Sequence, residues 1–178
     1  MSRHLFENRW AIRVIATLAR ANGSRFVVLR HALGVSAESL TTSLRWLMTE
    51  GWIEKNPGYG HPLRPEYVLT AAGARIAPAC IALDETTAEH DGLTGVLYRK
   101  WHAPVLVAVR SGASRFGEIE TALEGVTPRA LTRGLRDLVD AHLLDRVIED
   151  AYPPRPDYGL TMLGSEIAAK AEPLLVAP

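Results

Sequence analysis

The sequence predicts a mainly α-helical chain with small β-hairpins, an α+β protein made of two similar units in tandem. Its 178 residues suit one large domain or two small ones. An internal repeat decides between these alternatives, and both halves show the same order of predicted helices and strands. We therefore expect one unit over residues 1–83, a polar linker over 84–95 into which a helix could run partway, and a second unit over 96–178.

The repeat keeps a nearly constant spacing of 91 residues. Trp10 matches Trp101 at this spacing, and Gly-Val-Ser at 34–36 matches Gly-Val-Thr at 125–127. The register continues to the end of each unit through the pairs Leu40/Leu131, Leu44/Leu135, Arg64/Arg155, Tyr67/Tyr158 and Gly73/Gly164. Solenoid repeats are shorter, at about 20–50 residues, so the pattern indicates duplication of a domain-sized unit.

Three helices are predicted in the first part of the first unit. Apolar residues at helical spacing predict a helix over 6–20 and a shorter one over 25–33. A tight turn that ends in the N-cap candidate Ser36 leads into a third helix over 37–50. Its leucines recur every three to four residues, so one face is expected to be buried.

A hairpin and a closing helix are predicted to follow. Short strands are expected at 52–53 and 67–69. The segment 56–65 is rich in proline and glycine, so we expect it to stay out of regular structure. Thr70 can cap a final helix from 71 to about 83.

The second unit repeats this order. Helices are expected over 93–110, 115–123, 128–141 and 162–175, and strands over 143–149 and 156–160. Thr127 followed by Pro128 forms an N-cap with proline in the first helical position. Three helices with a tight turn, a two-stranded wing and a last helix make a winged helix-turn-helix, which offers its third helix to the major groove of DNA.

Composition excludes several classes of protein. The 20 basic and 20 acidic side chains cancel, which excludes a histone-like protein that binds DNA by bulk charge. The chain contains no apolar run near the roughly 18 residues of a membrane helix, and its start does not resemble a signal peptide. The single cysteine, Cys80, cannot form an internal disulfide, and a small buried apolar residue is favoured over a sensor thiol there. We expect a soluble cytoplasmic protein without a membrane partner.

Both units also resemble the HxlR-type winged-helix transcription regulators, relatives of the MarR group. The segments that carry the resemblance are 99–101, 114–119, 125–135 and 154–161 in the second unit, and 9–10, 24–26, 34–36 and 65–70 in the first. The resemblance implies binding to double-stranded DNA by a dimer with one winged helix per half-site. Two units in one chain then look like a covalent pseudo-dimer, for which a monomer with an internal pseudo-twofold is favoured over a homodimer and an imperfect palindrome is the expected site. Family members that sense electrophiles carry a cysteine near the start of the domain, and neither unit has one there.

The clearest candidates for DNA contact lie on the third helix of the second unit. Arg129, Arg133 and Arg136 share one helix face, with Thr132 beside them. A solvated arginine face is the ordinary alternative, but residues at the start of this helix meet bases in a winged helix-turn-helix. Arg155 lies in the wing, where a phosphate contact is favoured over simple stacking on a tyrosine.

The first unit offers weaker candidates. Ser39, Thr41, Thr42 and Arg45 lie on its third helix, and Arg64 lies in its wing. Glu38 stands where the second unit has Arg129, so this unit is interpreted either as a second reader of DNA or as a copy specialised in packing or ligand binding. Trp46 and Trp52 are the candidates for ligand contact.

No motif for catalysis is present in the sequence. The six histidines lack metal-ligand spacing, and a P-loop, GxGxxG or GxSxG motif is missing. We therefore expect no enzyme, no metal and no cofactor. The alternative function is a ligand-binding or protein-interaction protein on a winged-helix scaffold, which leaves room for a small-molecule effector. Residues 91–178 carry 10 basic and 12 acidic residues, and this surplus of acid favours the alternative.

Overall fold

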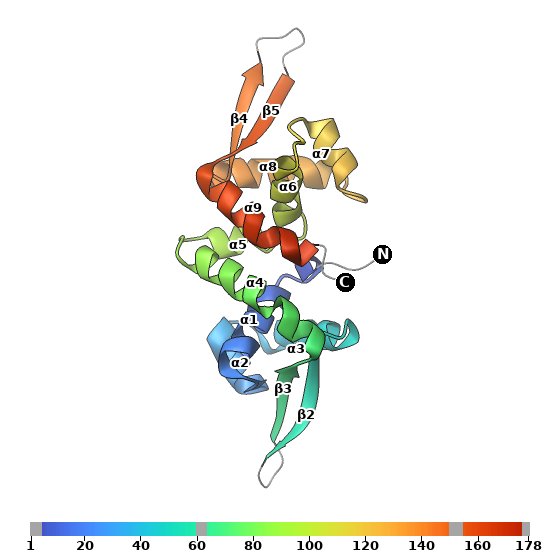
Figure 1. Ribbon diagram of the computed structural model, residues 1–178, viewed down its shortest axis with the longest axis vertical. Helices are drawn as coiled ribbons and strands as arrows, with labels where there is room; N and C mark the ends of the chain where they lie inside the picture. The colour runs from blue at the N-terminus through green and yellow to red at the C-terminus, as the bar shows by residue number, and fades with distance from the viewer. Residues whose placement is uncertain (1–4, 60–63, 150–154, 176–178) are drawn as a thin grey trace.

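The computed structural model describes residues 5–59, 64–149 and 155–175, and it consists of two similar halves placed end to end (Figure 1). The first half contains η1 (Leu5–Glu7), α1 (Ala11–Ala21), β1 (Ser24–Arg25), α2 (Phe26–Leu33), α3 (Ala37–Thr49), β2 (Ile53–Tyr59), β3 (Arg64–Leu69) and α4 (Ala71–Ala88). The second half contains α5 (Leu93–Leu97), α6 (His102–Arg110), α7 (Phe116–Ala122), α8 (Pro128–Asp140), β4 (Leu144–Glu149), β5 (Arg155–Leu160) and α9 (Met162–Leu175). This order confirms the predicted fold class of two tandem winged helix-turn-helix units.

The third helix of each half begins at a hydroxyl cap and buries a leucine stripe. The Ser36 Oγ accepts a hydrogen bond from the Ser39 backbone N–H at 3.2 Å, and the Thr127 Oγ1 accepts one from Ala130 N–H at 3.2 Å. The stripes are fully buried and consist of Leu40, Leu44 and Leu47 in α3 and Leu131, Leu135 and Leu138 in α8. Gly34 ends α2 in the left-handed conformation, with φ at 64°, which glycine adopts without strain.

Each wing is an antiparallel pair. β2 pairs with β3 from Ile53↔Leu69 onward, and β1 adds a short third strand to β3. The expectation that residues 56–65 lack regular structure was wrong at its ends, because β2 reaches Tyr59 and β3 begins at Arg64. The register shifts between Asn56 and Tyr59, so Pro57 lies where its missing N–H interrupts no regular ladder. The second wing pairs β4 with β5 without a shift.

The first helix of each half is shorter than predicted. Instead of one helix over 6–20, η1 is followed by a turn and then α1, and the Asn8 Oδ1 accepts a hydrogen bond from the Trp10 N–H at 3.0 Å. Such a local side-chain bond competes with helix formation. Instead of one helix over 93–110, α5 ends at Leu97 and α6 begins at His102. Pro104 lies in the first turn of α6, the part of a helix that tolerates proline.

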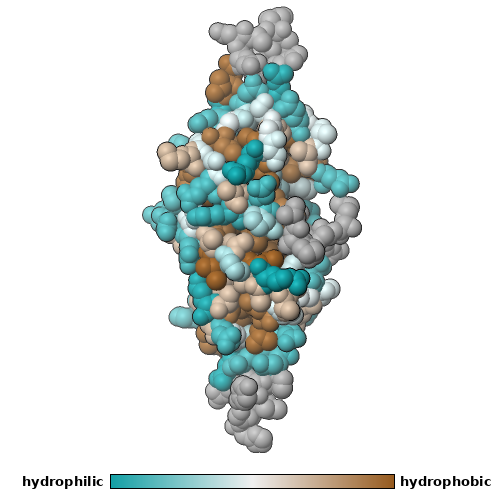
Figure 2. Space-filling view, in the orientation of Figure 1, coloured by the Kyte–Doolittle hydropathy of each residue, from teal (hydrophilic) through white to brown (hydrophobic). Residues whose placement is uncertain are grey.

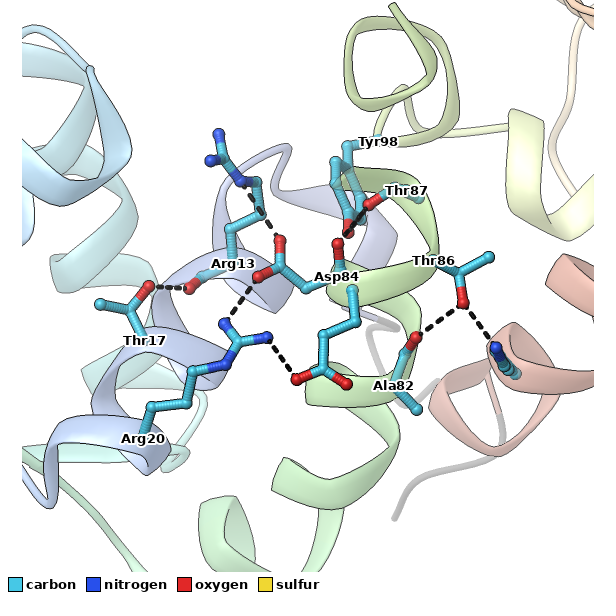
Figure 3. Close-up of polar contacts among 10 residues, drawn as sticks. Arg13, Thr17, Arg20, Ala82, Asp84, Thr86, Thr87 and Tyr98 are labelled. Atoms are coloured by element: carbon cyan, nitrogen blue, oxygen red, sulfur yellow. Dashed lines mark hydrogen bonds and ion pairs between the residues drawn. The ribbon is translucent and has the colours of Figure 1, made fainter. Parts of the chain in front are cut away.

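The segment predicted as a linker is mostly helical. α4 continues through residues 84–88, and α5 begins at Leu93. The polar side chains there contact neighbouring helices, which their composition did not indicate. Asp84 lies 2.8 Å from the Arg20 guanidinium on α1, and the Thr87 Oγ1 lies 3.0 Å from the buried Tyr98 hydroxyl (Figure 3).

The two halves meet at α4 and α9, which pack against each other. The Lys170 Nζ on α9 donates a hydrogen bond to the Thr86 Oγ1 on α4, and the Lys100 Nζ of the second half lies 3.9 Å from the Glu7 carboxylate of the first. In Figure 1 a half turn about the line of sight exchanges the two wings and brings α8 onto α3. Both third helices pass behind the layer of α4 and α9, so they lie on one side of the molecule.

Cys80 is fully buried on α4. Burial raises the pKa of its thiol to about 12, with the Asp84 carboxylate adding to the effect. The thiol therefore stays protonated at neutral pH, which confirms the interpretation as a small core residue. Within the described segments, helices are all too short or too polar to span a membrane.

Candidate nucleic-acid interface

The third helix of the second half presents an exposed basic face. Arg129, Thr132, Arg133 and Arg136 are all exposed on α8. Within the described residues, the guanidinium groups of Arg129 and Arg136 have no hydrogen-bond or ion-pair partner. The Thr132 Oγ1 donates to the Pro128 carbonyl at 2.8 Å, one turn back in the helix. Unpaired arginines on a capped helix are available for phosphate oxygens and for guanine.

A half-buried acidic residue, Asp137, anchors this helix to the rest of the half. The Asp137 carboxylate forms an ion pair with Arg99, which precedes α6, and lies 3.3 Å from the Nε2 of His102. Arg133 lies more loosely against the same carboxylate, at 3.9 Å, and its side chain is 70 % exposed. Because Arg99 already satisfies Asp137, Arg133 can turn toward a ligand at little cost.

His102 is buried at the start of α6, with 5 % of its surface exposed. Burial lowers its pKa, while Asp137 acts in the opposite direction through a hydrogen bond and its charge. The Nδ1 of the ring has no hydrogen-bond partner within the described part of the chain. The imidazole is thus neutral at pH 7 and links α6 to α8.

The third helix of the first half is more polar than basic. Thr41, Thr42 and Arg45 are exposed on α3, whereas Ser39 is half-buried and its Oγ lies 2.9 Å from the Ser36 Oγ. The Thr41 Oγ1 donates to the Ala37 carbonyl at 2.7 Å. α3 therefore offers one arginine and several hydroxyls where α8 offers three arginines.

The wing arginines fall at equivalent positions. Arg64 is the first residue of β3 and Arg155 the first residue of β5, and their side chains lie outside the described part of the structure. Figure 2 shows an apolar area next to the grey tip of the second wing, and the outer part of β4 carries the exposed Val147 and Ile148. An apolar wing of this kind was not predicted from the sequence.

A basic residue stacked on each repeated tryptophan was also missed. The Arg9 guanidinium lies 5.6 Å from the centre of the Trp10 ring, and the Lys100 ammonium lies 4.9 Å from the centre of the Trp101 ring. Both tryptophans are half-buried against the core. The signal was present in the repeat, since Arg9 and Lys100 match at the spacing of 91 residues.

The two tryptophans predicted for ligand contact differ from each other. Trp52 is buried, with 5 % of its surface exposed, and is packed into the core. It cannot stack on a ligand without unfolding the base of the wing. Trp46 is half-buried against the core and keeps an edge in solvent, as its position beyond the leucine stripe indicated.

A separate cavity of about 700 Å³ lies beside α8, the third helix of the second half. Its lining comes from the segment that joins α4 to α5, from the end of α8 and from the start of α9. Asp137 and Arg99 belong to this lining, so the cavity shares residues with the anchor of α8. Within the described segments, histidine, cysteine and acidic side chains form no group that could hold a metal ion.

Comparison with known proteins gives two matches to one family. The HxlR-like helix-turn-helix family matches the chain over residues 5–92 and again over 96–175. An uncharacterized HTH-type transcriptional regulator of Methanothermobacter thermautotrophicus is 38% identical over 68 residues, which cover 38% of this chain and 52% of the relative. The uncharacterized HTH-type transcriptional regulator YtfH of Escherichia coli is 32% identical over 75 residues, 42% of this chain and 60% of the relative.

The chain thus spans little more than half the length of these curated relatives. The solved structure of diamide-treated YodB from B. subtilis is similar with a TM-score of 0.40 and 23% identity, over 44% of this chain and 78% of that one. The two family matches together cover almost all of the sequence and agree with the two structural halves. They confirm the resemblance seen in the sequence: the chain belongs to the HxlR-like helix-turn-helix family, with two copies in tandem.

Proposed function

We propose that the chain is a sequence-specific DNA-binding transcription regulator. The observation that carries this proposal is the exposed arginine face of α8, which is capped at its start and free of ion-pair partners at Arg129 and Arg136 within the described residues. The N-terminal residues of such a helix reach base edges when it lies in the major groove. Arg129, Thr132, Arg133 and Arg136 are the proposed contacts of this helix.

In this proposal the first half of the protein binds the second half-site of the DNA. α3 lies on the same side of the molecule as α8 (Figure 1). Ser39, Thr41, Thr42 and Arg45 are its proposed contacts, and Arg64 and Arg155 of the wings bind phosphates. The units over 1–83 and 96–178 then act as the two halves of a dimer within one monomeric chain, and the site is an imperfect palindrome.

The proposed partner also defines where the chain works. In bacteria and archaea, the sources of the relatives above, chromosomal DNA lies in the cytoplasm. We therefore propose a cytoplasmic location.

The test is DNA selection from a random pool, followed by affinity measurement on the selected site at several salt concentrations. Arg129→Ala and Arg133→Ala should each weaken specific binding by about 1–3 kcal/mol if they contact bases. Arg75→Ala is the control, because Arg75 is exposed on α4 and belongs to neither of the proposed reading helices. Affinity should fall linearly with salt on a log–log plot. Failure to select any DNA at low salt would rule the proposal out.

A second candidate function is binding of a small-molecule effector in the cavity of about 700 Å³. The observation that favours it is the shared lining, because a ligand that contacts Asp137 or Arg99 would disturb the anchor of α8. Cavities of this size suit drug-sized molecules.

A thermal-shift screen of small metabolites tests this candidate. Ala141 lines the cavity, so Ala141→Trp should fill it and abolish the shift caused by a true ligand. Ala122→Trp, on the exposed face of α7, should keep the shift. A ligand that stabilises the Ala141→Trp variant as much as the wild type would show that the cavity is not its site.

A further inference from the structure

Glu38 and Arg129 occupy the same position in the two third helices but carry opposite charges. Each lies two residues after its cap, Ser36 for α3 and Thr127 for α8. Both side chains are exposed, and within the described residues neither has a hydrogen-bond or ion-pair partner. The start of α8 therefore presents a cation to a ligand, and the start of α3 presents an anion at the same position.

We propose that Glu38 determines specificity by accepting a hydrogen bond from the N4 amino group of a cytosine, while Arg129 binds guanine at the matching position of the other half-site. This inference rests on the proposed DNA-binding function. In the major groove, guanine shows two acceptors, which suit arginine, and cytosine shows an amino donor, which suits a carboxylate. The two side chains are therefore matched to opposite members of the same base pair.

A phosphate contact cannot explain Glu38. A carboxylate repels phosphate oxygens, so Glu38 is tolerated at a DNA surface only where a base or another group donates to it. The helix dipole also favours an acid in the first turn of α3. That contribution to the helix is the same whichever DNA is bound, so only base preference separates the two roles.

The surroundings of Glu38 support a site for a base edge. Glu38, Ser39 and Thr42 line a surface depression of about 350 Å³ together with Arg9 and Trp10. The stacked Arg9 places a cation at the rim of this depression, where a phosphate next to the base would lie. Glu7, which also lines it, has Lys100 within 3.9 Å to offset its charge. Glu38 thus lines a polar depression that also has the Arg9 cation in its lining.

The consequence is a defined break in the symmetry of the DNA site. Counted on the strand that each helix reads, the half-site of α8 carries G where the half-site of α3 carries C. All other differences between the helices change contacts in kind or number, whereas this one reverses the hydrogen-bonding demand.

The experiment is selection of bound DNA from a random pool by the wild type, Glu38→Gln, Glu38→Arg and Arg129→Gln. The wild type should prefer C in one half-site and G at the matching position of the other, each by roughly 5- to 150-fold over the wrong base. Glu38→Gln should change C to A, because glutamine pairs with adenine, and Glu38→Arg should change it to G. Arg129→Gln should alter only the other half-site, which assigns the two half-sites to the two helices.

Glu85→Gln is the matched control, because it removes one exposed acid of the first half on α4, outside the cavity and the reading helices. Its selected site should equal that of the wild type. The same base in both wild-type half-sites, or an unchanged site for Glu38→Gln and Glu38→Arg, would overturn the inference while leaving DNA binding intact. A wild type that selects no DNA would overturn the proposed function as well.

Discussion

Two glycines at equivalent positions show how closely each closing helix approaches its wing. A Cβ atom on Gly73 would lie 2.1 Å from the Trp52 carbonyl oxygen, and one on Gly164 would lie 2.0 Å from the Leu143 carbonyl oxygen. Real side chains do not tolerate such distances, so the first turn of α4 and of α9 can lie against the start of the wing only without a side chain there.

Gly164→Ala should therefore destabilise the protein by about 1–3 kcal/mol, because the backbone must move to admit the methyl group. Denaturant unfolding measures this change. Gly117→Ala is the matched control, since its Cβ would meet no atom within 4 Å on the exposed start of α7. We expect that control to be neutral or more stable by roughly 0.5–1 kcal/mol.

His102 should make stability depend on pH. Its pKa is lowered in the folded state, first by burial, so the unfolded chain binds a proton at a higher pH than the folded chain does. The free energy of unfolding should then fall as the pH drops below about 6.5, the ordinary value for histidine, toward the folded pKa. The charged groups that face the ring are Asp137, Arg99 and Arg133.

The measurement is denaturant unfolding at pH 7.5 and at pH 5.5 for the wild type and His102→Gln. The loss of stability between the two pH values should be smaller in the variant. His31→Gln, on the exposed face of α2, should behave as the wild type does. Equal losses in the wild type and His102→Gln would contradict the assignment.

At the scale of elements, one hydroxyl joins the closing helix to the wing in each half. The Thr161 Oγ1 donates to the His142 carbonyl at 2.9 Å and accepts from the Gly164 N–H at 3.0 Å. The Thr70 Oγ1 makes the same pair of bonds, to the Gly51 carbonyl at 2.7 Å and from the Gly73 N–H at 3.1 Å. Each threonine caps a helix and ties its start to the residues before the wing.

Thr161→Val should cost roughly 1–2 kcal/mol of stability, because it removes the cap and leaves two backbone groups without this partner. Thr161→Ser should keep most of the stability, since the hydroxyl remains. Thermal or denaturant unfolding of the two variants gives the comparison. Equal stability of the valine and serine variants would show that the hydroxyl contributes nothing.

The third helices were predictable because cap, leucine stripe and stop all lie within a short segment. Ser36 and Thr127 precede their helices in the sequence just as they cap them in the structure. The ends of the first helices were not predicted, because apolar spacing runs on across the turn before Trp10 and Trp101. Pro104 was a signal for the turn before Trp101, because proline is tolerated in the first turn of a helix and so favours a helix start there. The repeat extends this signal to the equivalent turn before Trp10.

Features that depend on distant partners escaped the sequence analysis. The polar stretch at 84–88 looked like a linker, because composition does not reveal its contacts with the distant residues Arg20, Tyr98 and Lys170 (Figure 3). The anchoring of Asp137 by Arg99 is a contact of the same kind, between residues 38 positions apart. The arginine face, by contrast, follows from spacing within one helix.

For the whole molecule, the contact of α4 with α9 predicts a monomer. These helices already pack against each other within the chain, so the pseudo-symmetric surface is not left free for a second copy. Light scattering at micromolar concentration should give a mass near 19.5 kDa, and this mass should not rise when the protein concentration is increased. A particle of twice that mass would contradict the prediction.

The covalent connection between the two halves has a consequence for how such a regulator responds to its own abundance. A regulator that must dimerise before it binds responds to the square of its concentration when it is scarce. A chain that carries both reading helices skips that step, so occupancy of its site would rise hyperbolically from the first molecules made. Mixed pairs of mutant and normal subunits also cannot form. A mutation in one half leaves the other half unchanged, whereas a mutation in a homodimer alters both subunits.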